Sequence, residues 1–153
     1  MTEKKSILFV CFGNICRSPC CEGICRKLYG DMLKVDSAST SQVHLNESPD
    51  DRAIDICMKH DVDIRDHHSK QLYQSDFTLF DLVVALDEQT LKLLNELKPE
   101  NCRAKVALFN PPNGIADPYY GGRVGFQKMY DQIEQNMKPF LVDNGLLKDE
   151  LKS

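Results

Sequence analysis

The sequence predicts an α/β fold: a four-stranded parallel sheet with helices on both faces, arranged as in Rossmann-like proteins. Short apolar segments alternate with longer segments whose apolar residues recur at helical spacing, the pattern of strands joined by crossover helices. Two apolar segments, Ile7–Val10 and Leu82–Leu86, contain no polar residue, as expected of strands buried on both faces of a sheet. A length of 153 residues fits one domain, so we expect a single domain over residues 1–153.

The order of the elements follows from the same patterns. Strands are predicted over Lys5–Val10, Leu33–Ser37, Leu82–Leu86 and Lys105–Phe109. Helices are predicted over Pro19–Gly30, from Ser48-Pro49 onward, from Asp87 or Glu88 onward, and over residues 124–142. Ser18 and Ser48 each precede a proline, which is the order of an N-cap and a first helical residue. The last helix carries an apolar stripe that should pack on the sheet: Phe126, Met129, Tyr130, Ile133, Met137 and Leu141.

The composition narrows the range of partners. A net charge of −4 argues against nucleic-acid binding. No apolar run approaches the ~20 residues of a membrane span, and the run after Met1–Lys5 is too short for a signal peptide. We therefore expect a cytoplasmic protein that binds neither nucleic acid nor a membrane. Seven cysteines without a secretory signal indicate free thiols, and the spacing of Cys20, Cys21, Cys57 and Cys102 does not fit a zinc site.

The side chains best suited to catalysis lie in one segment, Val10–Pro19, which reads V-C-F-G-N-I-C-R-S-P. It joins a predicted strand to a predicted helix start, where free backbone N–H groups and the helix dipole attract an anion. Cys11 would lie at that positive end, which favours the thiolate, the nucleophilic form of cysteine. Arg17 supplies a planar fork that matches two phosphate oxygens. The pair indicates phosphoryl transfer to sulfur.

The spacing between Cys11 and Arg17 is a weak signal by itself, because Cys20 and Arg26 repeat it. Cys20 falls inside the predicted helix with no strand before it, so the context favours Cys11 with Arg17. The structural alternative is that Cys11 is a core residue at a strand end and Arg17 a solvated surface charge.

From Cys11 to Pro19 the sequence resembles the signature loop of the low-molecular-weight protein tyrosine phosphatases, and the resemblance covers almost the whole chain. It includes Val35–Ala38, Phe80–Val83 leading to Asp87, and above all Asp117–Gly121, which reads D-P-Y-Y-G. The resemblance implies the fold of that family and a protein tyrosine phosphatase with acid phosphatase activity. Such an enzyme hydrolyses phosphotyrosine and small aryl phosphates through a phosphocysteine, here on Cys11, without a metal or cofactor.

The resemblance also implies roles around the loop, which is a P-loop in the sense that its backbone cradles phosphate. The phosphate-binding residues would be Phe12, Gly13, Asn14, Ile15, Cys16, Arg17 and Ser18. Asn14 would brace the loop through Ser37 and His67. Cys16 would be a resolving thiol that captures an oxidised Cys11 as a disulfide.

Hydrolysis of a tyrosine ester needs a general acid, because a phenol with a pKa of about 10 is a poor leaving group. Asp117 precedes Pro118, which restricts the Asp117 backbone to extended conformations and can aim its carboxylate. Asp-Pro is also a common turn dipeptide, and Asp87, at the end of another strand, is a rival acid. The resemblance favours Asp117. Because the carboxyl ends of parallel strands share one edge of the sheet, Cys11 and Asp117 should lie together.

The expected walls of the substrate site are Phe12, Val43, His44, Tyr119 and Tyr120, with Phe12 and Tyr119 facing a flat phenyl ring. The sequence departs from the family here, since many members carry an aromatic residue at the position of Val43. The departure concerns substrate preference and not the reaction.

The expected partners are phosphotyrosine-containing proteins or peptides, with inorganic phosphate as product and inhibitor, and the chain is expected to be a monomer or weak dimer. Three alternatives stay open. An arsenate reductase of this fold would use further cysteines, which residues 81–98 lack. A protein arginine phosphatase typically has Thr where this loop has Ile15. A redox-sensing phosphate-binding module would not need Asp117.

Overall fold

The computed structural model describes residues 4–148, in which one sheet contains four parallel strands. The strands are β1 (Lys5–Cys11), β2 (Leu33–Ser39), β3 (Leu82–Ala85) and β4 (Lys105–Leu108). Their spatial order is β2-β1-β3-β4. The predicted strands are confirmed, with ends that differ by at most two residues.

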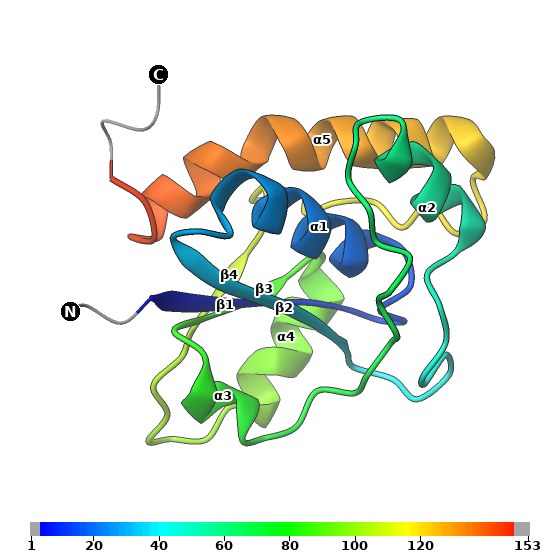
Figure 1. The fold of residues 1–153 in the computed structure, drawn as a ribbon. Coiled ribbons are helices and arrows are strands. Elements are labelled where there is room, and N and C mark those ends of the chain that lie inside the picture. The colour runs from blue at the N-terminus through cyan, green and yellow to red at the C-terminus, as the bar shows by residue number, and fades with distance from the viewer. Residues whose placement is uncertain (1–3, 149–153) are drawn as a thin grey trace.

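Helices cover both faces of the sheet (Figure 1). One face carries α1 (Arg17–Tyr29), α2 (Asp51–Met58) and α5 (Gly122–Asp143), and the other carries α3 (Asp76–Leu79) and α4 (Glu88–Leu97). This arrangement confirms the predicted fold class. The sequence did not predict α3, which is a single turn. Within the described residues, no helix combines the length and the apolar character that crossing a membrane requires.

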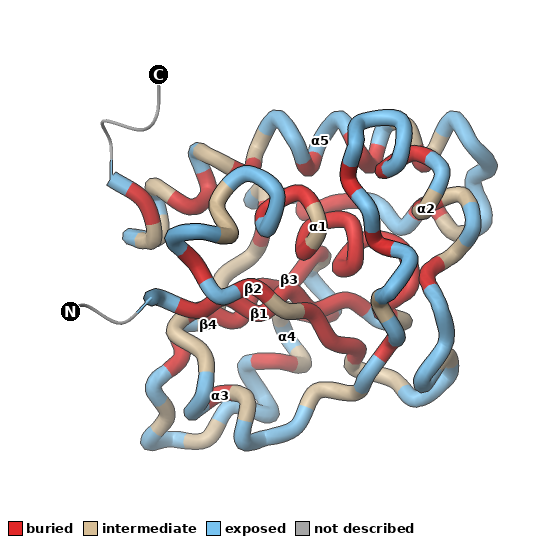
Figure 2. The backbone as a smooth tube through the Cα atoms, viewed as in Figure 1, coloured by how far each residue is buried: buried red, intermediate tan, exposed pale blue. Residues whose placement is uncertain are grey.

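The central strand β1 contributes to both halves of the hydrophobic core, because its side chains alternate across the sheet. Ile7 and Phe9 pack with residues of α1, α2 and α5, whereas Leu8 and Val10 pack with residues of α3 and α4. Figure 2 shows β1 and β3 as largely buried segments at the centre of the molecule, whereas the edge strand β4 is only partly buried. The predicted stripe of α5 is confirmed, since all of its members are buried: Phe126, Met129, Tyr130, Ile133, Met137 and Leu141.

The first helix begins two residues earlier than predicted, at Arg17 instead of Pro19, with Cys16 at the cap position. The Ser18 hydroxyl lies 2.9 Å from the Cys11 sulfur and does not cap the helix. The prediction of Ser18 as N-cap is therefore wrong. The loop after β1 wraps so closely around Cys11 that the helix starts inside it, and the serine faces the loop interior.

The start of the second helix also differs from the prediction. The cap of α2 is Asp50, whose carboxylate accepts the backbone N–H of Arg52 at 2.9 Å, and the prediction of Ser48 is wrong. The Asp50 N–H itself donates to the Ile15 carbonyl at 2.9 Å. Because this bond ties the start of α2 to the loop after β1, a tertiary contact selects the cap residue.

The strand order places the carboxyl end of β1 at a topological switch point. From β1 the chain crosses to β2 on one side and later returns to β3 on the other side. Cys11 is the last residue of β1. The loop after β4 folds back over the same edge, where the Ile115 N–H donates to the Leu86 carbonyl at 2.8 Å. Open α/β sheets bind their ligands at such edges.

Candidate active site

The Cys11 sulfur lies at the centre of the loop that joins β1 to α1. It is within 2.9 Å of the Ser18 hydroxyl and accepts the backbone N–H of Asn14 at 3.2 Å. Both donors come from the N-terminal side of α1, where the helix dipole also favours negative charge. These surroundings would stabilise negative charge that develops on the Cys11 sulfur during a reaction, although only 3% of the residue is exposed.

Asn14 holds the loop in shape from inside. Its backbone adopts a φ of 58°, in the left-handed region that few residues other than glycine occupy. The side-chain amide donates to the hydroxyls of Ser18 at 2.7 Å and Ser37 at 3.0 Å. Its oxygen contacts His67 Nε2 at 3.1 Å and accepts the Lys70 N–H at 3.1 Å. The structure thus brings both predicted partners, Ser37 and His67, to Asn14.

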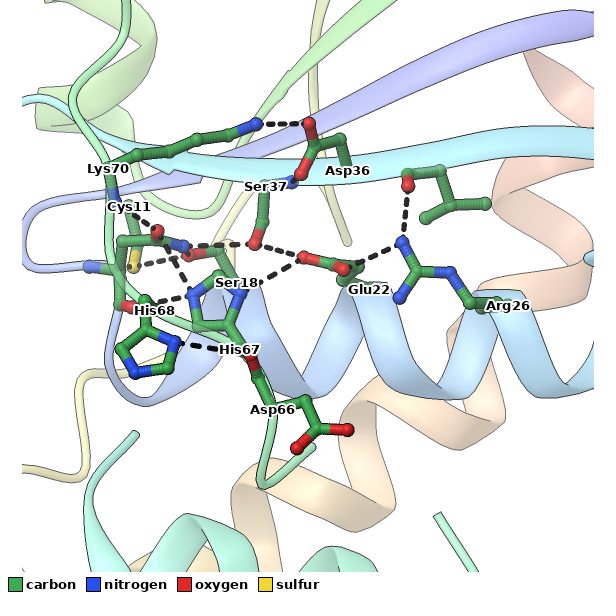
Figure 3. Close-up of polar contacts among 12 residues, drawn as sticks. Cys11, Ser18, Glu22, Arg26, Asp36, Ser37, Asp66, His67, His68 and Lys70 are labelled. Atoms are coloured by element: carbon green, nitrogen blue, oxygen red, sulfur yellow. Dashed lines mark hydrogen bonds and ion pairs between the residues drawn. The ribbon is translucent and has the colours of Figure 1, made fainter. Parts of the chain in front are cut away.

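A buried carboxylate that the sequence did not predict as part of the site, Glu22 on α1, supports these partners (Figure 3). Ser37 Oγ donates to Glu22 Oε1 at 2.5 Å, and His67 Nδ1 lies 3.4 Å from the same oxygen. Arg26 contacts the other oxygen at 2.7 Å. Burial disfavours the charged form, but the contacts with His67, Ser37 and Arg26 outweigh it and lower the pKa of Glu22. Glu22 is therefore an ionised anchor beneath the loop.

The same network explains why Cys20 and Arg26 are not a second phosphate site. Cys20 is fully buried inside α1. Arg26 pairs with Glu22 and donates to the Val35 carbonyl at 2.6 Å. The spacing of Glu22 and Arg26, four residues apart on one helix, is the sequence signal that could have revealed this pair.

Arg17 lies under the loop with 3% of its surface exposed. One nitrogen, Nη1, donates to Asp87 Oδ2 at 2.8 Å and to the Ile115 carbonyl at 2.9 Å. The other, Nη2, lies 3.7 Å from Asp117 Oδ2. Burial opposes the charge of Arg17, but the charge of Cys11 and the contact with Asp87 outweigh it and raise the pKa of Arg17. The guanidinium is therefore held in one orientation beside Cys11.

Asp117 and Asp87, the two carboxylates that compete for the role of acid, have different surroundings. Asp87 caps α4, because its Oδ1 accepts the Thr90 N–H at 2.7 Å while its Oδ2 binds Arg17. Burial raises the pKa of Asp87, but the bonds from Thr90 and Arg17 outweigh it and hold the pKa below its usual value. The Asp117 side chain is half exposed, with one oxygen accepting the Tyr119 N–H at 3.1 Å. Of these two carboxylates, Asp117 is the one that lines the cavity described next.

A cavity of about 290 Å³ joins the predicted residues at the edge of the sheet. It is lined by the loop residues and by the expected walls: Cys11, Phe12, Gly13, Asn14, Ile15, Cys16, Arg17, Val43, His44, Asp117, Tyr119 and Tyr120. Ser18, Ser37 and His67 contribute from behind the loop. The cavity thus gathers residues from the loops after β1, β2 and β4.

The walls of the cavity are aromatic and apolar at the rim. The His44 ring lies against the Tyr119 ring with centroids 5.7 Å apart, and His44 Nδ1 contacts Glu47 at 3.1 Å. Val43 and Phe12 are exposed to solvent. A flat aromatic ester could enter between these side chains, with its phosphate directed at the loop.

Known proteins share this sequence and fold. Residues 6–152 match the family model for low molecular weight phosphotyrosine protein phosphatase. The chain is 38% identical to the proteins of that name from Sus scrofa, over 149 residues, and from Saccharomyces cerevisiae, over 152 residues. Each alignment covers 90% of this chain and 94% of the relative.

Solved structures agree with these sequence matches. The low molecular weight protein tyrosine phosphatase from Tritrichomonas foetus has a TM-score of 0.84 and 52% identity, over 96% of this chain and 100% of that one. A drosophila arginine phosphatase has the same TM-score of 0.84 with 27% identity, over 94% of this chain and 99% of that one. The predicted family resemblance is thereby confirmed: the chain belongs to the low molecular weight phosphotyrosine protein phosphatase family and is a phosphatase.

Proposed function

We propose that this protein hydrolyses phosphotyrosine in proteins and peptides, and small aryl phosphates, through a phosphocysteine on Cys11. Membership of the family implies that the protein is a phosphatase and that its substrates are phosphoproteins. The single observation that carries the assignment of roles is that Cys11, Arg17 and Asp117 border one cavity, although Asp117 follows a different strand. Each of the three has the chemistry that one part of the reaction requires.

In the first step the Cys11 thiolate attacks phosphorus and the bond from phosphorus to the tyrosine oxygen breaks. Arg17 and the loop N–H groups hold the three equatorial oxygens, on which the transition-state charge accumulates. Asp117 gives its proton to the departing phenolate oxygen, which would otherwise leave as a strong base. Asp87 has a positioning role, because it fixes the guanidinium that binds the phosphate.

In the second step a water molecule attacks the phosphocysteine and releases inorganic phosphate. Asp117, now ionised, takes the proton from that water, as the reverse of its first role requires. Cys11 leaves as a thiolate, which Ser18 Oγ and the Asn14 N–H stabilise from 2.9 and 3.2 Å. The phosphate product binds the same groups as the substrate and inhibits by competition. None of these steps requires a metal or a cofactor.

The alternative substrate within this fold is phosphoarginine, since one structural relative is an arginine phosphatase. We favour phosphotyrosine as the substrate, because the loop has Ile15 where arginine phosphatases typically have Thr, and because aromatic side chains line the cavity. The test is the rate of phosphate release from matched peptides carrying phosphotyrosine, phosphoserine or phosphoarginine, with arsenate reduction measured beside them. Preference for phosphoarginine, or reduction of arsenate, would contradict the proposal.

Several narrower predictions belong to the same proposal. Cys16 is the thiol that captures an oxidised Cys11, and its pKa is raised by burial, so it rests as the protonated thiol.

The chain is one phosphatase domain over residues 1–153, of which 1–3 and 149–153 lie outside the described residues. It acts in the cytoplasm as a monomer or weak dimer, away from nucleic acid and membranes. Sedimentation over a range of concentrations tests the oligomeric state.

A further inference from the structure

A second pair of thiols lies behind the catalytic loop. Cys20 on α1 and Cys57 on α2 place their sulfur atoms 3.2 Å apart, and both residues are fully buried. The sequence separates them by a strand and a loop, so only the packing of α1 on α2 brings them into contact. Neither residue takes part in the hydrolysis proposed above.

We propose that Cys20 and Cys57 form a second redox site, which receives an oxidising equivalent from the catalytic loop and holds it as a disulfide between α1 and α2. The oxidant is a hydroperoxide, ROOH, and for hydrogen peroxide the alcohol product named below is water. The proposal rests on the proposed function, because the oxidant reacts first with the nucleophile Cys11. Its consequence is that the enzyme returns its own nucleophile to the thiolate state without an external reductant.

The arrangement of the sulfur atoms supplies a route from the cavity to this pair. Cys11 and Cys16 line the cavity, so a small hydroperoxide reaches them from solvent, whereas Cys20 and Cys57 are enclosed. Cys16 and Cys20 lie one helical turn apart, with the Cys20 N–H donating to the Cys16 carbonyl at 3.3 Å. Cys16 is close enough to feel the charge of Cys11, and Cys20 that of Cys16. The four thiols therefore form a series.

Each transfer balances in atoms and electrons. The hydroperoxide oxidises Cys11 to a sulfenic acid and leaves as the alcohol; Cys16 then attacks the Cys11 sulfur, which expels water and forms a Cys11–Cys16 disulfide. Cys20 attacks the Cys16 sulfur and releases Cys11 as a thiolate. Cys57 attacks the Cys20 sulfur, releases Cys16 and completes the Cys20–Cys57 bond. In total, Cys20 and Cys57 lose two electrons and two protons, and the hydroperoxide becomes alcohol and water.

The geometry also sets the pace of the transfer. The Cys20 and Cys57 sulfurs must close from 3.2 Å to the ~2.05 Å of a disulfide, a small movement of two packed helices. The contact with Cys57, together with burial, raises the pKa of Cys20, so its thiolate is rare and its attack is slow. Uncatalysed disulfide exchange takes roughly minutes to hours. The recovery of Cys11 should fall in that range.

The test starts from wild-type enzyme inactivated by hydrogen peroxide, after which the peroxide is removed and no thiol reductant is added. We expect hydrolysis of an aryl phosphate to recover over hours. Trypsin then separates the sites, because Cys11 and Cys16 stay on peptide 6–17, Cys20 falls on peptide 18–26 and Cys57 on peptide 53–59. Mass spectrometry without reduction should show the link between peptides 18–26 and 53–59 appear as activity returns, with fragment spectra assigning it to Cys20.

Two variants sharpen the result. Cys20→Ser removes the thiol that releases Cys11, so it should keep its activity before peroxide, lose it to peroxide as wild type does, and recover only after a reductant is added. Cys25→Ser removes another fully buried cysteine of α1, farther from the loop, and should recover like wild type. Recovery of Cys20→Ser at the wild-type rate, or recovered wild type without the link, would overturn the proposal.

The wild-type peptide map tests the proposal even if Cys20→Ser does not fold. The proposed function is scored separately, by hydrolysis of aryl phosphate before any peroxide is added. An enzyme that hydrolyses the ester but never forms the Cys20–Cys57 link retains the proposed function and refutes only the second redox site.

Discussion

The guanidinium of Arg17 donates to Asp87 at 2.8 Å, and this bond distinguishes the two carboxylates that the sequence left in competition. Asp87 uses both oxygens, one for Arg17 and one for the N–H of Thr90 at the start of α4. A carboxylate so engaged stays ionised and orients its partners. Asp117 accepts the Tyr119 N–H with one oxygen, and its other oxygen lies at the longer distance of 3.7 Å from Arg17. Its half-exposed side chain lines the cavity, which is consistent with the proposed role of acid.

Asp117→Ala should lower the rate of phosphoryl transfer by about 10²–10⁴-fold for phenyl phosphate or phosphotyrosine. The loss should be much smaller for an aryl ester with a strongly electron-withdrawing ring, whose phenolate leaves without a proton. The discriminating measurement is the dependence of the phosphorylation rate on leaving-group pKa in wild type, Asp117→Ala and Asp87→Ala. We expect a steeper dependence only in the Asp117 variant, and steepening in Asp87→Ala instead would reassign the acid.

Asp87→Ala serves as the matched variant with a different expected defect. Loss of the bond to Arg17 should raise KM and weaken inhibition by phosphate. Loss of the cap on α4 should also lower stability by about 0.5–2 kcal/mol. Phosphate inhibition constants and thermal unfolding measure the two effects, and wild-type values for both would show that Asp87 has no positioning role.

Cys11→Ser should abolish turnover while leaving binding of a phosphotyrosine peptide intact, because the loop N–H groups and Arg17 remain. A serine hydroxyl at neutral pH is a far weaker nucleophile than a thiolate. Hydrolysis of an aryl phosphate and peptide binding by calorimetry are measured on the same preparation. Wild-type turnover in this variant would end the assignment of Cys11 as nucleophile.

Arg17→Lys should be nearly as damaging as loss of the nucleophile, although it keeps the positive charge. An ammonium group cannot donate two parallel hydrogen bonds, and it cannot span Asp87 and the phosphate as the guanidinium does. We expect a large fall in kcat/KM for all aryl phosphates, good and poor leaving groups alike. A variant that retains most of its activity would show that charge alone suffices at this position.

Glu22→Gln tests the ionised anchor beneath the loop through the pH dependence of stability. The lowered pKa of Glu22 means that its ionised form stabilises the fold. That contribution is complete above the unfolded-state pKa of about 4.3 and is lost as the pH falls through the lower folded-state value. Glu22→Gln should therefore unfold at lower temperature than wild type at neutral pH, with the difference shrinking below about pH 4. A difference in melting temperature that is independent of pH would point to packing.

Activity should survive chelation, because Arg17 and backbone N–H groups supply the positive charge that the transferred phosphate requires. The measurement is hydrolysis of an aryl phosphate after dialysis against EDTA. Loss of activity that a divalent ion restores would contradict the phosphocysteine mechanism as proposed.

The sequence by itself determined the elements and the outline of the site. Buried strands appear as apolar runs, and the stripe of α5 recurs at helical spacing, because both depend on periodicity within one segment. The succession of strand, loop and helix around Cys11 and Arg17 is local in the same way. In parallel sheets the carboxyl ends of all strands lie at one edge, and this rule predicts that Asp117 lies near Cys11.

Only the tertiary structure decided what each polar side chain contacts. Ser18 has the sequence context of a helix cap, yet it faces the Cys11 sulfur. Glu22 and Arg26 look like an ordinary surface pair, yet they anchor Ser37 and His67 beneath the loop. The physical reason is that a hydrogen bond or a sulfur contact forms only when two atoms, on segments far apart in the chain, are positioned to within a few tenths of an ångström. Local propensity carries no information about those distances, which the packing of α1 on the sheet and α2 determines.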